Sequence, residues 1–150
     1  MDTDLQGLYK GILLDHARRP RGRGRPDDAT LVRHGRNTLC GDDVELAVVL
    51  AYGTLVRVGF QGRACAVCTA SASMLTEAVQ GLTCAAAADL YRRLARWMSG
   101  QGQFDDVPDP LRALAVVRSY PARVRCALLP WETLHDALEA VRTTAEDGGC

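Results

Sequence analysis

Six cysteines are the residues of this sequence best suited to chemistry. In a reducing compartment, thiols serve as metal ligands or as nucleophiles more often than as structural cross-links. Two of them stand at C-x-x-C spacing in "QGRACAVCTASASML", which runs from Gln61 to Leu75. That spacing suits a redox pair, half of a zinc knuckle, or two thiols on one face of a helix. The six are Cys40, Cys65, Cys68, Cys84, Cys126 and Cys150.

The composition describes an ordinary globular chain with no global charge. The sequence has 150 residues, of which 47% are apolar, and its 18 basic and 18 acidic residues cancel. This length predicts a single domain over 1–150 with its own core. No apolar run could cross a bilayer, and "MDTDLQGLYKGILLDHARRP" is not typical of a secretory signal. We therefore expect a cytoplasmic protein that does not contact a membrane.

The arginine-rich stretch "RRPRGRGR" does not by itself indicate a nucleic-acid partner. It has no interleaved aromatic residues, and the chain as a whole is neutral. Nucleic-acid binding needs a basic surface and a recognisable module. We expect no nucleic acid and interpret the stretch as a solvated loop or a partner-docking surface.

Periodic patterns predict the elements that must position the cysteines. Strand alternation over 44–50 and 56–60, around a turn at Tyr52 and Gly53, predicts a β-hairpin. The segment 29–32 is a candidate third strand. Helical periodicity is found at 5–16, 66–81, 83–98 and after a break at Tyr120 and Pro121. The predicted fold is α+β, with a small antiparallel sheet of about three strands packed against several helices.

Two further boundaries are predicted from capping residues and from composition. Thr83 is a suitable N-cap, and Asp109 followed by Pro110 is a suitable N-cap and first-turn pair for the next helix. The tail from about residue 143 is expected to be disordered.

Three cysteines lie at junctions between these expected elements. Cys40 precedes the hairpin and is followed by Gly41 and Asp42, Cys65 marks the change from hairpin to helix, and Cys126 is placed at the start of the last helix. A thiol at a helix N-terminus has a lowered pKa. Three thiolates and a carboxylate suit tetrahedral zinc or an iron–sulfur cluster. The spacing alone does not decide whether they meet, because local zinc fingers take their ligands in close pairs.

Four segments resemble a known family in order and spacing. They are "LYKGILLDHARRPRGRG", "LCGDD", "GFQGRACAVCTASASMLTEAV" and "YPARVRCALLPW", and together they resemble the U-type iron–sulfur assembly proteins (IscU, the NifU N-terminal domain and SufU) over Leu8 to Glu139. The loop "SGQGQFDD" and Arg125, where the IscU branch carries a His, are similar to the SufU branch. The Pro-Pro-Val-Lys segment that IscU offers to an Hsp70 chaperone is absent; "SYPARVRC" stands there.

The resemblance implies a function and a set of site residues. The positions that match the family's metal ligands are Cys40, Asp42, Cys65 and Cys126. In SufU-type proteins they hold Zn²⁺, and the thiol matching Cys40 accepts persulfide sulfur from a SufS-type cysteine desulfurase that displaces it from the metal. The chain would then be a zinc-dependent, sulfurtransferase-like acceptor that activates the desulfurase and serves downstream iron–sulfur assembly proteins.

Two alternatives to this function stay open at this point. One is a scaffold on which a transient Fe–S cluster is assembled and transferred, and the other is a purely structural zinc module.

The remaining thiols and histidines have plainer expected roles. Cys68 is interpreted as a small, semi-buried helix residue, with a spare ligand or a resolving thiol as alternatives. A thioredoxin pair is excluded because no buried βαβ strand precedes it. Ala64 stands where the family usually has Gly. Cys84 is expected to be a core residue and Cys150 a free terminal thiol. His16 is expected to be a packing or partner-facing residue, His34 a solvated loop residue and His135 a structural residue.

Overall fold

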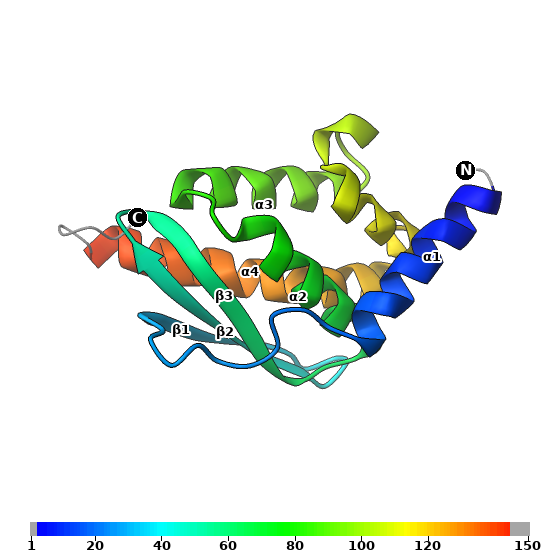
Figure 1. Cartoon of the computed structure of the whole chain (residues 1–150). Helices are drawn as coiled ribbons and strands as arrows, with labels where there is room; N and C mark the ends of the chain where they lie inside the picture. The colour runs from blue at the N-terminus through cyan, green and yellow to red at the C-terminus, as the bar shows by residue number, and fades with distance from the viewer. Residues whose placement is uncertain (1–2, 145–150) are drawn as a thin grey trace.

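A three-stranded antiparallel sheet forms one side of the molecule. In the computed structural model, which describes residues 3–144, the strands are β1 (Leu31–Asn37), β2 (Asp42–Ala51) and β3 (Thr54–Arg63). They pair in the order β1-β2-β3. Helices cover one face of this sheet (Figure 1). The predicted α+β fold is confirmed.

The β2–β3 hairpin forms where the alternating pattern predicts it. Val44, Leu46 and Val48 of β2 are at most 1% exposed, so one face of the strand enters the core. Tyr52 and Gly53 have φ angles of 54° and 75°, and two successive positive φ angles are typical of a type I′ turn. The candidate strand at 29–32 exists, but it begins at Leu31 and continues to Asn37.

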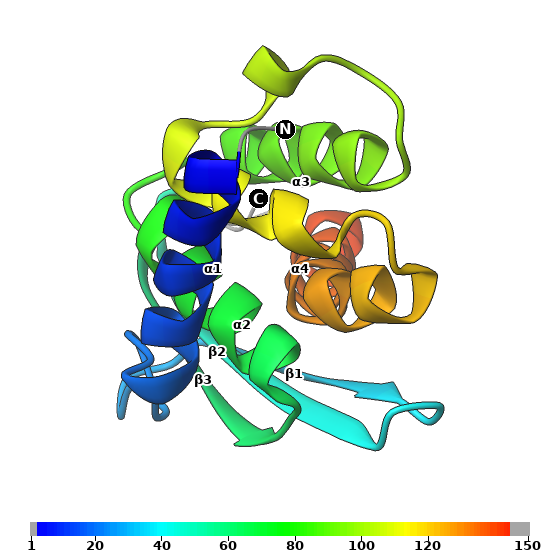
Figure 2. The ribbon, with the colours of Figure 1, turned by 90° about the vertical axis from the view of Figure 1, so that its right-hand side faces the viewer.

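Helices form two further layers over the sheet. Figure 2 shows α2 and α4 lying directly on the sheet, α1 beside α2, and α3 on the far side. A connection containing two short 3₁₀ helices joins α3 to α4. The elements are α1 (Thr3–Arg18), α2 (Ala66–Val79), α3 (Cys84–Met98), η1 (Phe104–Asp106), η2 (Asp109–Val117) and α4 (Pro121–Thr144).

Most predicted helix boundaries are confirmed, and two need correction. Thr83 caps α3 by accepting a hydrogen bond from the Ala86 N–H at 3.1 Å. Asp109 begins a 3₁₀ helix instead of capping an α-helix, with Pro108 at the N-cap. Cys126 lies in the second turn of α4, because that helix already begins at Pro121. The expected disordered tail falls almost entirely on 145–150, outside the described residues.

Helix α2 is the central element of the fold. Every residue from 67 to 76 is buried, and the small side chains of this run allow neighbouring elements to approach closely. Ser71 and Ser73 are two residues apart, which is about 200° around a helix, so they face opposite sides. Ser71 Oγ accepts a hydrogen bond from Trp131 Nε1 of α4 at 3.0 Å and donates to the Ala127 carbonyl.

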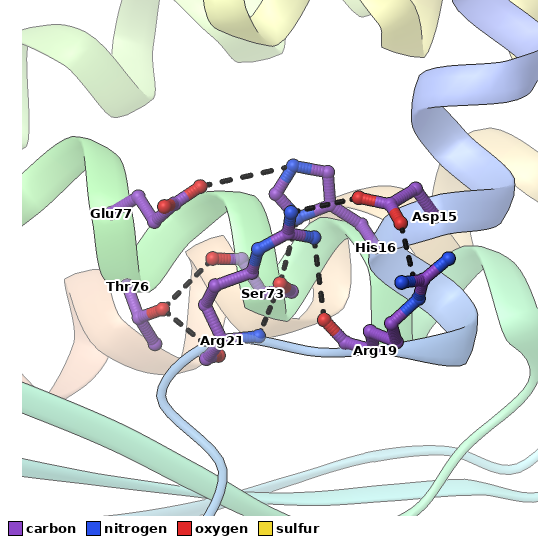
Figure 3. Close-up of polar contacts among 7 residues, drawn as sticks. All are labelled: Asp15, His16, Arg19, Arg21, Ser73, Thr76 and Glu77. Carbon is purple, nitrogen blue, oxygen red and sulfur yellow. Dashed lines mark hydrogen bonds and ion pairs between the residues drawn. The ribbon is translucent and has the colours of Figure 1, made fainter.

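Ser73 makes the corresponding attachment to α1. Its Oγ lies 2.7 Å from His16 Nδ1 and accepts a hydrogen bond from the Arg21 N–H at 2.7 Å (Figure 3). His16 Nε2 lies 3.8 Å from Glu77 Oε1, and Arg21 forms an ion pair with Asp15 at 2.7 Å. His16 is 9% exposed. It is therefore the packing residue predicted from the sequence.

The surroundings of His16 make the fold sensitive to pH. Burial lowers the pKa of His16, and the nearby Arg21 lowers it further, against smaller raising effects from Glu77 and Asp15. The unfolded chain, with an ordinary histidine pKa of about 6.5, therefore binds a proton more readily than the folded chain.

We expect the free energy of unfolding to fall as the pH drops below about 6.5, because protonation then favours the unfolded state. Urea denaturation at pH 7.5 and 5.5 measures this loss. His16→Gln should lose less stability over the same interval, since its side chain does not titrate. His34 and His135 remain in both proteins, so equal losses would contradict the assignment to His16.

Helix α4 lies closely across β1 at Gly35. A Cβ atom at this position would collide with the Thr133 side chain and lie 3.3 Å from Leu129 Cδ1. Only glycine at position 35 therefore allows α4 to lie this close to the sheet. Because α4 carries Cys126, the close approach also positions that cysteine.

We expect Gly35→Ala to destabilise the protein by about 1–3 kcal/mol, the usual cost of overpacking. Gly11→Ala is the matched control, because a Cβ there meets no atom within 4 Å. In that helical position alanine should be neutral or stabilising. Urea denaturation of both variants checks the difference, and equal stabilities would contradict the close approach.

Candidate metal centre

Three segments far apart in the sequence meet at one end of the molecule. They are the turn between β1 and β2, the start of α2, and the first turns of α4 (Figures 1 and 2). Each carries one of the cysteines predicted to be a ligand. The sheet places the first two segments side by side, and the packing of α4 on β1 brings the third to them.

Cys40, Asp42 and Cys126 form a compact cluster of ligand atoms. One sulfur or carboxylate oxygen from each lies within 4.8 Å of the other two. The sulfurs of Cys126 and Cys40 are 3.3 Å apart, well beyond disulfide bonding distance, and both thiols are free. Ligand atoms around tetrahedral zinc, with bonds of about 2.0–2.3 Å, lie roughly 3.3–3.8 Å apart. The cluster is thus close to the size of a zinc coordination shell.

Cys65 is held beside this cluster through Asp42. Its N–H donates to Asp42 Oδ1 at 2.8 Å, and its sulfur lies 3.9 Å from Asp42 Oδ2. Cys65 is also the N-cap of α2, where its sulfur accepts a hydrogen bond from the Cys68 N–H at 3.4 Å. The structure therefore brings three of the four predicted ligands together and places the Cys65 sulfur next to the carboxylate.

The ligand atoms differ sharply in their access to solvent. Asp42 is 2% exposed and Cys126 is 0% exposed, whereas Cys40 is exposed. Burial raises the pKa of the Cys126 thiol, and hydrogen bonding with Cys40, Asp42 and Cys65 raises it further. Cys126 does not gain from the unpaired N–H groups of a helix start, because it lies in the second turn of α4.

Asn37 organises the turn that presents Cys40, and it was not predicted from the sequence. Its carbonyl accepts the Cys40 N–H at 3.3 Å, and its Oδ1 accepts the Leu39 N–H at 3.2 Å. Its Nδ2 lies 4.0 Å from the Cys126 sulfur. Gly41 follows with φ +72°, a conformation that favours glycine. An Asn two residues before an N–H that it binds is typical of an Asx-turn, and this signal could have identified it.

Cys68 and Cys84 lie outside the three-residue cluster. Cys68 is fully buried in α2, deeper than the semi-buried position predicted. Cys84 begins α3 and is 8% exposed, so the prediction of a core residue is confirmed. Cys150 lies outside the described residues.

The two remaining histidines also lie away from the cluster. His34 was predicted in a loop but belongs to β1, where its Nε2 lies 3.4 Å from Glu45 Oε2. His135 stacks on Tyr91 with ring centroids 4.7 Å apart, in keeping with the structural role predicted.

The donor set suits a soft or borderline metal. Thiolates select zinc and iron–sulfur clusters over hard cations, and a carboxylate is an accepted partner of both thiolate and imidazole ligands of zinc. The Cys40, Asp42 and Cys126 cluster with Cys65 beside it fits such a group. Fold and site together define a small α+β protein with a thiol-rich candidate metal site at one end. No helix within residues 3–144 is long and apolar enough to cross a membrane.

The chain belongs to the NifU-like N terminal domain family, which it matches over residues 8–142. It is 31% identical to the zinc-dependent sulfurtransferase SufU of Bacillus subtilis over 150 residues, covering 99% of this chain and 97% of the relative. It is 30% identical to the iron–sulfur cluster assembly scaffold protein IscU of Thermotoga maritima over 134 residues, covering 89% of this chain and 94% of the relative. The protein is thus a member of the iron–sulfur cluster assembly family that includes IscU and SufU.

A solved structure agrees with this assignment. The crystal structure of an iron–sulfur cluster assembly scaffold protein for the SUF system from Fervidobacterium islandicum superposes with a TM-score of 0.80 at 28% identity. The superposition covers 91% of this chain and 98% of the chain in the crystal structure.

We expect Asp42→Ala to lower zinc affinity about tenfold or more, because it removes a ligand atom together with the acceptor of the Cys65 N–H. Asp42→Asn should retain the acceptor of the Cys65 N–H and therefore lose less zinc affinity than Asp42→Ala. The measurement is zinc content after dialysis against a graded series of chelator concentrations.

Asp43→Asn is the matched control. Asp43 is adjacent in sequence but forms an ion pair with Arg36 at 3.3 Å and is not in the cluster. Zinc retention should therefore be unchanged in this variant. If Asp42→Ala retained zinc as well as Asp43→Asn, the carboxylate would not be a ligand.

Proposed function

We propose that this protein accepts sulfur for iron–sulfur cluster assembly in the manner of SufU. In this proposal Cys40 takes persulfide sulfur from a SufS-type cysteine desulfurase in the cytoplasm, and Cys40, Asp42, Cys65 and Cys126 hold zinc. The observation that carries the proposal is the contrast in burial within the cluster. Cys40 is exposed on a turn, while Asp42 and Cys126 are buried. An acceptor thiol must reach a partner's active site, and residues that retain a metal need not.

The transfer itself needs no net oxidation. The Cys40 thiolate attacks the terminal sulfur of the desulfurase persulfide, and a new S–S bond forms on Cys40. The old S–S bond breaks, and the desulfurase cysteine leaves as a thiolate. Zinc, when bound, keeps its thiol ligands deprotonated and has no redox chemistry of its own.

The residues around Cys40 suit a thiol that must move. Leu39 is 74% exposed, and Gly41 can adopt backbone conformations that other residues avoid. Asp42 lies at the first residue of β2 and is fixed by the Cys65 N–H. The turn can therefore carry Cys40 outward while the buried side chains stay in place.

Two sequence features support the SufU branch within the family. Arg125 precedes Cys126 where the IscU branch carries a His, and the connection after α3 contains the extra segment 99–106 with η1. The similarity to the Bacillus subtilis sulfurtransferase also extends over nearly the whole chain. The similarity to IscU scaffold proteins supports a second candidate, a scaffold that assembles an Fe–S cluster on the same residues.

We expect Cys40→Ser to abolish stimulation of the desulfurase while the protein stays folded. The side chain is exposed, so its replacement removes no core contact. Alanine release from cysteine measures the stimulation, mass spectrometry of the wild type locates the persulfide, and thermal unfolding reports on the fold. A variant that still stimulates at the normal rate would exclude Cys40 as the acceptor.

Two observations separate the proposed sulfur acceptor from its alternatives. If the protein were a purely structural zinc module, Cys40→Ser should unfold. Purification without oxygen should give about one zinc per chain and no sulfide if the protein accepts sulfur. Iron with matching sulfide would favour the scaffold.

A further inference from the structure

The turn that carries Cys40 is fixed at both of its ends. Asn37 and Asp42 face one another as a pair of the β1–β2 ladder, and residues 38–41 form the whole connection between the two strands. Asn37 is half-buried and Asp42 is buried. Gly41 has a φ of +72°, and a Cβ there would meet open space. Cys40 can therefore change position through rotations within 38–41, without disturbing the ladder.

The side chain of Asn37 joins this turn to the buried thiol of α4. Its Oδ1 accepts a hydrogen bond from the Leu39 N–H at 3.2 Å, and its Nδ2 donates to the Cys126 sulfur at 4.0 Å. Because the Leu39 N–H can only donate, the carboxamide oxygen must face it, and the NH₂ group then faces Cys126. The Asn37 carbonyl also accepts the Cys40 N–H at 3.3 Å. One residue thus contacts both the exposed turn and the buried part of the cluster.

These contacts keep the Cys40 sulfur beside the Cys126 sulfur, which lies 3.3 Å away. The N–H groups of Leu39 and Cys40 both donate to Asn37, so a movement of Cys40 out of the cluster strains or breaks these bonds. The Leu39 bond is exposed, and water can replace an exposed partner at a small net cost. The hold on Cys40 is therefore real but weak, as a ligand that must leave requires.

We propose that Asn37 is a positioning residue of the sulfur acceptor, and that its side chain sets how readily Cys40 leaves the other ligands. With the Leu39 N–H bound, Cys40 is held against Cys126. When a partner displaces Cys40, the Leu39 bond breaks, while the carboxamide keeps its contact with the Cys126 sulfur. This inference rests on the proposed function, because the ease of release matters only if Cys40 both binds zinc and accepts sulfur.

Alkylation resolved by site tests the proposal without any activity assay. Zinc-loaded protein is treated with iodoacetamide, and mass spectrometry of quenched samples gives the rate at each cysteine. A zinc-bound thiolate is protected, so the rate at Cys40 reports its release. We expect Asn37→Ala to raise this rate about three- to tenfold, the usual effect of one lost hydrogen bond. Asn37→Asp retains an acceptor for the Leu39 N–H, so its rate should lie much closer to that of the wild type.

Thr38→Ala is the matched control. Thr38 is exposed in the same turn, and its replacement leaves the Asn37 contacts in place, so the rate at Cys40 should equal that of the wild type. Equal rates in the wild type and Asn37→Ala would overturn the proposal, as would Asn37→Asp reacting as fast as Asn37→Ala. Faster alkylation of the buried Cys126 and Cys68 in Asn37→Ala would also overturn it, because the change would then loosen the whole fold.

The zinc content of each sample is measured first, so that two kinds of failure can be told apart. A wild type that binds no zinc would overturn the metal centre and this inference together. With zinc bound, the alkylation rates decide this inference alone. Stimulation of the desulfurase does not enter the measurement, so the acceptor role of Cys40 can fail separately.

Discussion

The structure depends on a central helix whose two serines attach it to neighbours on opposite sides. Ser71 and Ser73 are buried, and they bind α4 and α1 respectively. A helix buried on every side needs small residues for close approach, yet each buried hydroxyl must find a partner. The alternation of alanine and serine from Ala70 to Ser73 meets both requirements. The position of α4, and with it that of Cys126, follows from this attachment.

The proposed metal centre combines an exposed turn with buried parts of two helices. Cys126 comes from a helix fixed on both the sheet and α2, and Cys65 comes from the N-cap of α2 itself. Cys40 comes from an exposed turn whose backbone is organised by Asn37 and Gly41. In the proposed function, such a centre can release its exposed sulfur while its buried residues stay in place. A sulfur acceptor needs an accessible thiol, so this difference in burial supports the proposed function.

Much of the fold could be predicted from the sequence because its signals are local. Alternation predicted the hairpin, Tyr52 and Gly53 marked its turn, and Thr83 marked the start of α3. The predictions failed where a local signal had more than one solution. Asp109 with Pro110 suited an α-helical cap, but the segment forms a 3₁₀ helix. The residues around His34 show no strand pattern in the sequence, and they form a strand because they pair with β2.

The sequence by itself determined most of the elements, the junction at Cys65 and the resemblance to the iron–sulfur assembly proteins. Only the tertiary structure decided which thiols meet and which of them is exposed. Cys40 and Cys126 are 86 positions apart, and no local pattern encodes a contact over that distance. Burial of Cys126 and Cys68 arises from the packing of α2, α4 and the sheet, and burial is a property of neighbours brought together by folding. For that reason only the tertiary structure distinguishes the exposed Cys40 from the buried Cys68 and Cys126.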